Sequence, residues 1–172
     1  MFEGKNKAVT FSYDDAVTQD IRLIEILNKY NLKATFNLNS GLLGSKLDLM
    51  LGNVKVSANK IKPEDIKHIY AGHEVAAHTL THPHLPKIED EKEIIRQVEE
   101  DRLNLSELVG YEVIGMAYPG GPPNCNDRIA EIIKNNTGIK YARSFDVDGT
   151  FNADKEFASL PALSRVAPLS VD

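Results

Sequence analysis

The chain has 172 residues, 42% hydrophobic and 26% charged, a composition typical of a folded globular protein rather than a disordered segment. Its 20 basic and 25 acidic residues give a net charge of −5, which argues against a nucleic-acid binder or a protein attracted to anionic membrane surfaces. No apolar run approaches the roughly 18–20 residues of a membrane span, and the single cysteine, Cys125, excludes an internal disulfide framework.

Short β-rich segments alternate with helical patterns along the chain. In chain order, the predicted elements are a strand over 8–13, a helix over 18–30, a strand over 34–38, an unpatterned loop or small excursion over 39–60, a helix over 63–71, a strand over 73–78, a helix over 90–109, a strand over 113–118, a helix over 126–135, and a strand over 140–144. Thr18 is the expected N-cap of the first helix, Pro63 opens the second, and Gly110 follows the end of the third. The tail from Asp146 is only weakly patterned.

This alternation predicts an α/β protein with a parallel sheet, because each strand–helix–strand unit returns the chain to the same edge of the sheet. We expect one domain over residues 1–172, folded as a distorted or partial (β/α) barrel with parallel strands and outer helices. The N-terminal residues lack the apolar stretch of a signal peptide, so we expect a cytoplasmic protein or a trimmed domain of an exported one.

Chemistry in such folds collects at the C-terminal ends of the strands. Carboxylates, imidazoles, a Pro-Gly turn and a guanidinium follow the predicted strands, namely Asp14 and Asp15, His78 and His82, residues 117–123, and Arg143. The convergence of these groups on one rim carries more weight than any single motif.

The two histidines are four residues apart, a spacing that can place both rings on one face of a helical turn or tight loop. Two imidazoles and one carboxylate can bind a catalytic zinc and leave one position open. An isolated pair of this kind is more often two surface residues, and the strand context reverses that expectation here. His84 is interpreted as an exposed loop residue, His73 as structural, and Cys125 as an incidental thiol.

Asp14 and Asp15 follow an apolar strand directly, and adjacent residues that leave a strand point in different directions. One can therefore bind a metal while the other accepts a proton from water, as metal-assisted hydrolysis requires. The alternative is that Asp15 only caps the helix that follows.

Two segments resemble the polysaccharide deacetylases, carbohydrate esterase family four with its NodB-homology domain. Residues 72–85, GHEVAAHTLTHPHL, look much like the family's second motif. Residues 10–16, TFSYDDA, look like its first motif, usually TFDDG, with Ala16 in place of the glycine. The resemblance covers roughly residues 8–145 and implies a distorted (β/α) barrel.

The resemblance implies that Asp14 is the general base and that Asp15, His78 and His82 bind one divalent metal. Zinc is the expected ion, and cobalt, nickel or another divalent ion is also compatible with nitrogen and oxygen ligands.

The family's third motif, usually Arg-x-Pro-x-Gly, reads AYPGG at residues 117–121, so its arginine is absent. Arg143, at the end of a neighbouring predicted strand, can supply the missing charge beside the base. A backbone N–H near Gly120 can still stabilise an oxyanion, because that role needs no side chain. Tyr118 and Pro119 are the expected substrate-binding residues.

The later motifs of the family are not intact. No histidine follows His84, and the nearest equivalent of the family's Leu-x-His, which supplies the general acid, is Leu-Ser-Arg at residues 163–165. Asp146 and Asp148 stand near the fourth motif, Asp-x-x-Asp-Trp, but the chain has no tryptophan. The domain is therefore expected to lack the C-terminal motif.

The resulting hypothesis is a metal-dependent hydrolase that removes acetyl groups from an N-acetylated or O-acetylated carbohydrate. Its partner would be a glycan, with neither nucleic acid nor membrane involved. The alternatives are a metal-bearing carbohydrate-binding protein with little or no turnover, favoured by the missing histidine, and a small-amide hydrolase on the same scaffold. The sequence does not predict the glycan or the oligomeric state.

Overall fold

A computed structural model describes residues 9–144 of the chain. Its centre is a five-stranded sheet in which every neighbouring pair of strands is parallel. Across the sheet, the strands are β1 (Ser12–Asp14), β2 (Thr35–Leu38), β5 (Glu74–Ala77), β6 (Gly115–Ala117) and β7 (Tyr141–Arg143). The predicted parallel α/β fold is confirmed, although the first strand begins later than expected.

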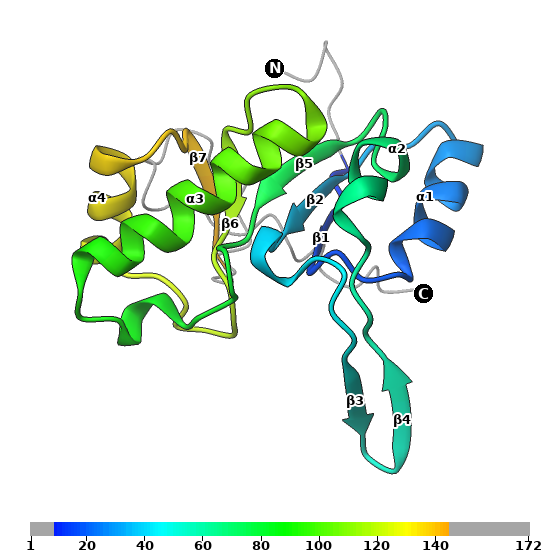
Figure 1. Ribbon diagram of the computed structural model, residues 1–172, viewed down its shortest axis with the longest axis horizontal. Coiled ribbons are helices and arrows are strands. Elements are labelled where there is room, and N and C mark those ends of the chain that lie inside the picture. Colours follow the sequence, from blue (N-terminus) through cyan, green and yellow to red (C-terminus); the bar gives the residue numbers. More distant parts are fainter. Residues whose placement is uncertain (1–8, 145–172) are drawn as a thin grey trace, which may run out of the picture.

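Helices cover the outside of this sheet (Figure 1). They are α1 (Asp20–Lys29), α2 (Ile66–Ile69), α3 (Glu91–Val109) and α4 (Asp127–Asn136), with single 3₁₀ turns at η2 (Ser40–Leu42), η3 (Pro63–Asp65) and η4 (Leu85–Lys87). Figure 1 shows α1 and α2 beside the β1–β2 end, α4 beside the β7 end, and the long helix α3 between them. Within residues 9–144, no helix has the length and apolarity needed to cross a bilayer.

The ends of the two later helices follow their sequence signals. Asp90 caps α3 by accepting a hydrogen bond from the Lys92 N–H, and Gly110 ends this helix in the left-handed region at φ 83°. Asn126 caps α4 through the Ile129 N–H. The predicted N-cap Thr18 is wrong, because α1 starts at Asp20 after Gln19. The Thr18 N–H instead donates to the Asn59 carbonyl, so this residue links the loop after β1 to the loop after β4.

The unpatterned segment 39–60 contains an antiparallel hairpin that the sequence analysis missed. Its strands are β3 (Asp48–Leu51) and β4 (Val54–Ser57), joined by a two-residue turn in which Gly52 has φ 62°. A Gly-Asn pair between two β-rich runs is a known hairpin signal. Figure 1 shows the hairpin projecting away from the sheet, so it adds no strand to the barrel.

The hydrophobic core lies between the sheet and the helices. Fully buried side chains from the three central strands include Phe36, Leu38, Val75 and Met116, and α3 and α4 contribute Ile94, Val98, Leu105, Ile129 and Ile133. The central strands are buried along most of their length, as expected for a parallel sheet covered by helices.

Curvature brings the two edges of the sheet together. A flat sheet would place β1 and β7 roughly 19 Å apart, four strand spacings of about 4.8 Å, yet the Arg143 guanidinium on β7 forms an ion pair with Asp14 on β1. The five strands are therefore curled into the predicted partial (β/α) barrel.

Candidate metal centre and catalytic base

The two adjacent aspartates diverge because the backbone turns sharply between them. Asp14 is the last residue of β1, whereas Asp15 and Ala16 adopt positive φ values of 85° and 53°. The Asp15 N–H donates to the Asn37 carbonyl of β2 at 2.9 Å, which anchors the turn to the neighbouring strand. The two carboxylates consequently enter different environments.

Asp14 is held by partners from the strands around it. Its Oδ1 accepts a hydrogen bond from Asn37 Nδ2 at 2.8 Å and also pairs with the Arg143 guanidinium. Its Oδ2 lies 4.0 Å from His78 Nε2. Burial opposes ionisation of this carboxyl, but His78, Arg143 and the hydrogen bonds from Arg143 and Asn37 outweigh it and lower the pKa of Asp14 below its usual value.

Sheet register explains why Arg143 can reach this position. Arg143 and Ala117 are paired Cα partners on β7 and β6, so their side chains point to the same face of the parallel sheet. The arginine that the resemblance leads us to expect at position 117 is thus supplied one strand further along, on the same face. The structure brings Arg143 to Asp14, as the sequence analysis anticipated on geometric grounds.

His78 follows β5 and is only 2% exposed. Its Nδ1 lies 2.8 Å from the Ala117 carbonyl oxygen, which can only accept, so Nδ1 carries the proton and Nε2 keeps a lone pair directed at the carboxylates. Burial lowers the pKa of His78 despite the nearby Asp14 carboxylate, which favours the neutral imidazole that binds metals. This arrangement is typical of a metal-ligating histidine.

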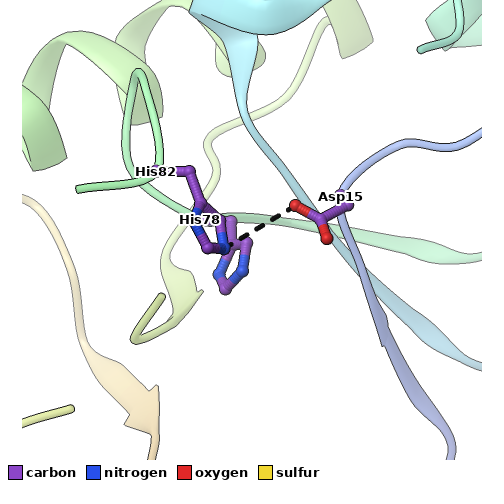
Figure 2. Close-up of side chains that lie close together, drawn as sticks. All are labelled: Asp15, His78 and His82. Carbon is purple, nitrogen blue, oxygen red and sulfur yellow. Dashed lines mark ion pairs between the residues drawn. The ribbon is translucent and has the colours of Figure 1, made fainter. Parts of the chain in front are cut away.

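His82 lies in the loop after β5 and completes the cluster. Its Nε2 is 3.8 Å from Asp15 Oδ1, and its ring packs edge-on against His78 with centroids 4.9 Å apart. Figure 2 shows the Asp15 carboxylate facing the two imidazoles across a small gap.

The donor set fits a divalent metal. One potential ligand atom from each of Asp15, His78 and His82 lies within 4.8 Å of the others. In a tetrahedral zinc site, bonds of about 2.0–2.2 Å separate two ligand atoms by about 3.4 Å, so the side chains would have to approach one another by up to about 1.5 Å to bind an ion. The sequence analysis predicted these three residues as a set, and the structure brings them together.

Two further residues contact the aspartates and were missed. Lys60 is buried, and its Nζ lies 3.4 Å from Asp15 Oδ1. It falls in the segment 39–60, where no pattern marked it. Asn37 was detectable in principle, because it is a polar residue between the apolar Phe36 and Leu38 of β2.

The predicted substrate-binding roles of Tyr118 and Pro119 are not supported, because both residues are buried. The Tyr118 N–H donates to the Arg143 carbonyl at 2.9 Å, which extends the β6–β7 pairing beyond Ala117. Tyr118 therefore shares the face of Met116, two residues earlier, and packs in the core. Burial raises the pKa of its hydroxyl, with Cys125 adding to the effect.

The turn after β6 contains Gly120, near which the sequence analysis predicted a backbone N–H that stabilises an oxyanion. Gly120 has φ 82°, and Asn124 Nδ2 donates to the carbonyls of both Tyr118 and Gly120. A Cβ on Gly120 would lie 3.4 Å from the His84 ring, so His84 borders this turn. His84 is half-buried rather than exposed as expected, and its Nδ1 is buried and has no hydrogen-bond partner among the described residues. Asp146, Asp148 and residues 163–165 lie outside the described residues.

The polysaccharide deacetylase family model matches residues 3–142 of the chain. No functionally curated protein shows significant sequence similarity to it.

Several solved structures share the fold. The deacetylase PplD of Streptococcus pyogenes, solved with acetate, is 24% identical over 78% of this chain and 55% of its own, with a TM-score of 0.63. A de-N-acetylase of Aggregatibacter actinomycetemcomitans is 19% identical over 81% of this chain and 63% of its own, with a TM-score of 0.64. A carbohydrate esterase family 4 pseudoenzyme of Bacillus anthracis is 20% identical over 80% and 43%, with a TM-score of 0.58. The chain thus spans between 43% and 63% of these proteins.

Proposed function

The chain belongs to the polysaccharide deacetylase family, and from this premise we propose that it is a metal-dependent hydrolase that removes acetyl groups from an N-acetylated or O-acetylated glycan. The observation that carries the proposal is the ionised Asp14, paired with Arg143, beside the donor set of Asp15, His78 and His82.

Asp15, His78 through Nε2 and His82 would hold the metal, most suitably zinc. When bound, such an ion supplies a Lewis acid that polarises the acetyl carbonyl and makes water more acidic.

Asp14 is suited to act as the general base. Asn37 and Arg143 both bind its Oδ1, so Oδ2, which faces His78, is the oxygen positioned to accept a proton from the attacking water. Its lowered pKa keeps the carboxylate ionised at neutral pH. The backbone N–H near Gly120 would stabilise the negative charge that develops on the acetyl oxygen.

A metal-bearing glycan-binding protein with little or no turnover is the second candidate. It is favoured by one comparison, the structural similarity to the Bacillus anthracis pseudoenzyme of carbohydrate esterase family 4. The pairing of Asp14 with Arg143 argues against it, because binding alone does not need a positioned base.

Acetate release from a chitin oligomer and from an aryl acetate, by chelator-stripped and zinc-reloaded protein, tests the proposal. We expect activity only after zinc is added. Asp14→Asn should retain zinc and lose about 10²–10⁴-fold in rate, because an amide cannot accept the proton.

Three outcomes would contradict this assignment. Zinc-independent acetate release would remove the metal from the mechanism. Glycan binding without acetate release, unchanged in Asp14→Asn, would support the binding protein instead. Loss of zinc in Asp14→Asn but not in Asp15→Asn would exchange the roles of the two aspartates.

A further inference from the structure

Helix α3 buries three polar side chains, Gln97, Asp101 and Arg102, and the first two bind loops that follow strands of the sheet. Gln97 is 3% exposed and Asp101 is fully buried, and their spacing of four residues places them one above the other on one face of the helix. Polar groups this deeply buried need hydrogen-bond partners. Apart from Glu93 on the same helix, which accepts from Gln97 Nε2 at 3.0 Å, their partners lie in the turn after β2 and in the histidine loop, which we define as residues 78–82.

Asp101 joins two segments that follow neighbouring strands. Its Oδ1 accepts the Ser40 N–H at 2.6 Å. Its Oδ2 accepts the His78 N–H at 2.9 Å and shares this donor with the Leu38 carbonyl of β2, also at 2.9 Å. Both carboxylate oxygens are therefore used, one of them by the backbone of a proposed metal ligand.

Gln97 holds the middle of the histidine loop. Its backbone carbonyl accepts the Leu80 N–H at 2.8 Å, and its side-chain Oε1 accepts the Thr81 N–H at 3.0 Å. Its Nε2 also donates to the Thr81 hydroxyl at 2.9 Å. The N–H groups of His78, Leu80 and Thr81 are thus all bound by two residues of α3.

The histidine loop has a backbone that needs such support. Thr79 has φ 66° and His82 has φ 59°, values that a β-branched or bulky residue rarely adopts. Strained residues of this kind persist where the surrounding structure holds them in place, and they cluster at functional sites. Asn39 adds to the support by donating to the carbonyls of His78 and Thr79.

We propose that Gln97 and Asp101 are positioning residues, which hold the histidine loop so that His78 and His82 face Asp15 at metal-binding distance. The inference rests on the proposed metal site and concerns how that site is built. The hydrogen bonds of these two side chains do not involve the side-chain atoms that are proposed to bind the metal. Gln97 and Asp101 act through backbone hydrogen bonds on the residues that carry the imidazoles.

Zinc affinity of Asp101→Asn and Gln97→Met, measured by competition with a chromophoric chelator, tests the proposal. Asn would direct an N–H₂ group at one of the two N–H donors, and Met fills a similar volume without hydrogen bonds. We expect each variant to lose about 10–100-fold in zinc affinity, as for other outer partners of metal ligands. The absorption spectrum of the cobalt-loaded protein should change as well, because it depends on ligand geometry.

Leu105→Ala is the matched control. Leu105 is fully buried on the same helix, and its truncation leaves a cavity without removing a hydrogen bond to residues 78–82. We expect it to lower the unfolding temperature yet retain the zinc affinity and cobalt spectrum of the wild type. Equal losses of affinity in Leu105→Ala and Gln97→Met would show general destabilisation and overturn the proposal. Unchanged affinity in both polar variants would also overturn it.

Circular dichroism at the assay temperature establishes that each variant is folded, and Gln97→Met remains decisive if Asp101→Asn does not fold. The readout is metal binding rather than acetate release. A wild type that binds zinc but releases no acetate would therefore contradict the proposed function alone.

Discussion

Two buried histidines flank the same short strand, and they are used in opposite ways. At the N-terminal end of β5, His73 Nδ1 accepts the Ala34 N–H at 3.3 Å and Nε2 lies 3.1 Å from Asn28 Oδ1, so both ring nitrogens serve the fold. At the C-terminal end, His78 binds a carbonyl through Nδ1 only and turns Nε2 toward two carboxylates. The lesson is that burial alone does not identify a ligand, whereas the partner of the second nitrogen does.

The largest expected effect tests the difference between His78 and His73 directly. His78→Ala should abolish zinc binding and acetate release, with a loss greater than the roughly 10–100-fold that follows removal of an outer partner. His73→Ala should bind zinc like the wild type under conditions in which the variant is folded. Equilibrium dialysis with elemental analysis checks both, and retention of zinc by His78→Ala would contradict the ligand assignment.

A third histidine sharpens the comparison at the C-terminal end. His84 borders the turn at Gly120, and no histidine follows it in the sequence. We expect the chain to cleave an aryl acetate faster than an N-acetylated chitin oligomer by about 10²–10⁴-fold, the usual contribution of a general acid, because an ester oxygen leaves without full protonation.

The same two substrates assayed with His84→Ala identify the proton donor. An unchanged ratio of ester to amide cleavage would agree with a site that lacks a dedicated acid. A selective further loss of amide cleavage would assign that role to His84. Strong amide cleavage by the wild type, undiminished in His84→Ala, would show that another group donates the proton.

The pH dependence of the reaction should also change when Arg143 is replaced. Arg143→Gln removes the guanidinium that helps to lower the pKa of Asp14. With that pKa raised, the rate should start to fall at a higher pH as the solution is acidified, and kcat/KM should drop by about 10–100-fold, the equivalent of one charge-assisted hydrogen bond. Lys140→Gln, which removes an exposed charge just before β7, is the control and should leave the pH profile unchanged.

The smallest effect concerns His73 and stability. Burial, with a contribution from Lys33, lowers the pKa of His73 below its unfolded value near 6.5. The folded state therefore binds a proton at His73 less readily than the unfolded state does. The contribution of neutral His73 to the free energy of unfolding is complete above the unfolded pKa and is lost as the pH falls through the folded pKa.

His73→Gln cannot titrate, so it should flatten the decline in unfolding free energy that sets in as the pH falls below the unfolded pKa of about 6.5. At pH 8 we expect a loss of about 1–3 kcal/mol from imperfectly paired buried groups. Urea unfolding at several pH values measures both quantities. A wild-type slope retained in His73→Gln would assign the pH dependence to other groups.

The sequence was most informative where chemistry and strand ends coincide. Asp14, Asp15, His78 and His82 follow β-rich runs, and parallel strands deliver their C-terminal residues to one rim, so the cluster could be predicted. Arg143 could be anticipated for the same reason. Gly110 marked the end of α3 through local chemistry alone, whereas the expected cap at Thr18 was wrong.

What could not be predicted depends on distant contacts. Gln97 and Asp101 look like ordinary surface positions in a helix of mixed polarity, and only packing against residues 78–82 shows their role. Tyr118 looks exposed beside a Pro-Gly turn until its pairing with β7 places it in the core. Lys60 owes its burial beside Asp15 to the base of the hairpin, for which the sequence analysis assigned no structure.

The ion pair across the curled sheet has a consequence for how the protein matures. Asp14 and Arg143 are 129 residues apart in sequence, so a ribosome adding about 5–20 residues per second needs roughly 6–26 s after making the base to make its partner. Until β7 has been synthesised and docked, the nascent chain carries Asp14 without its guanidinium. Asp14 therefore gains its full activation as a base only after residue 143 has been made and β7 has joined the sheet.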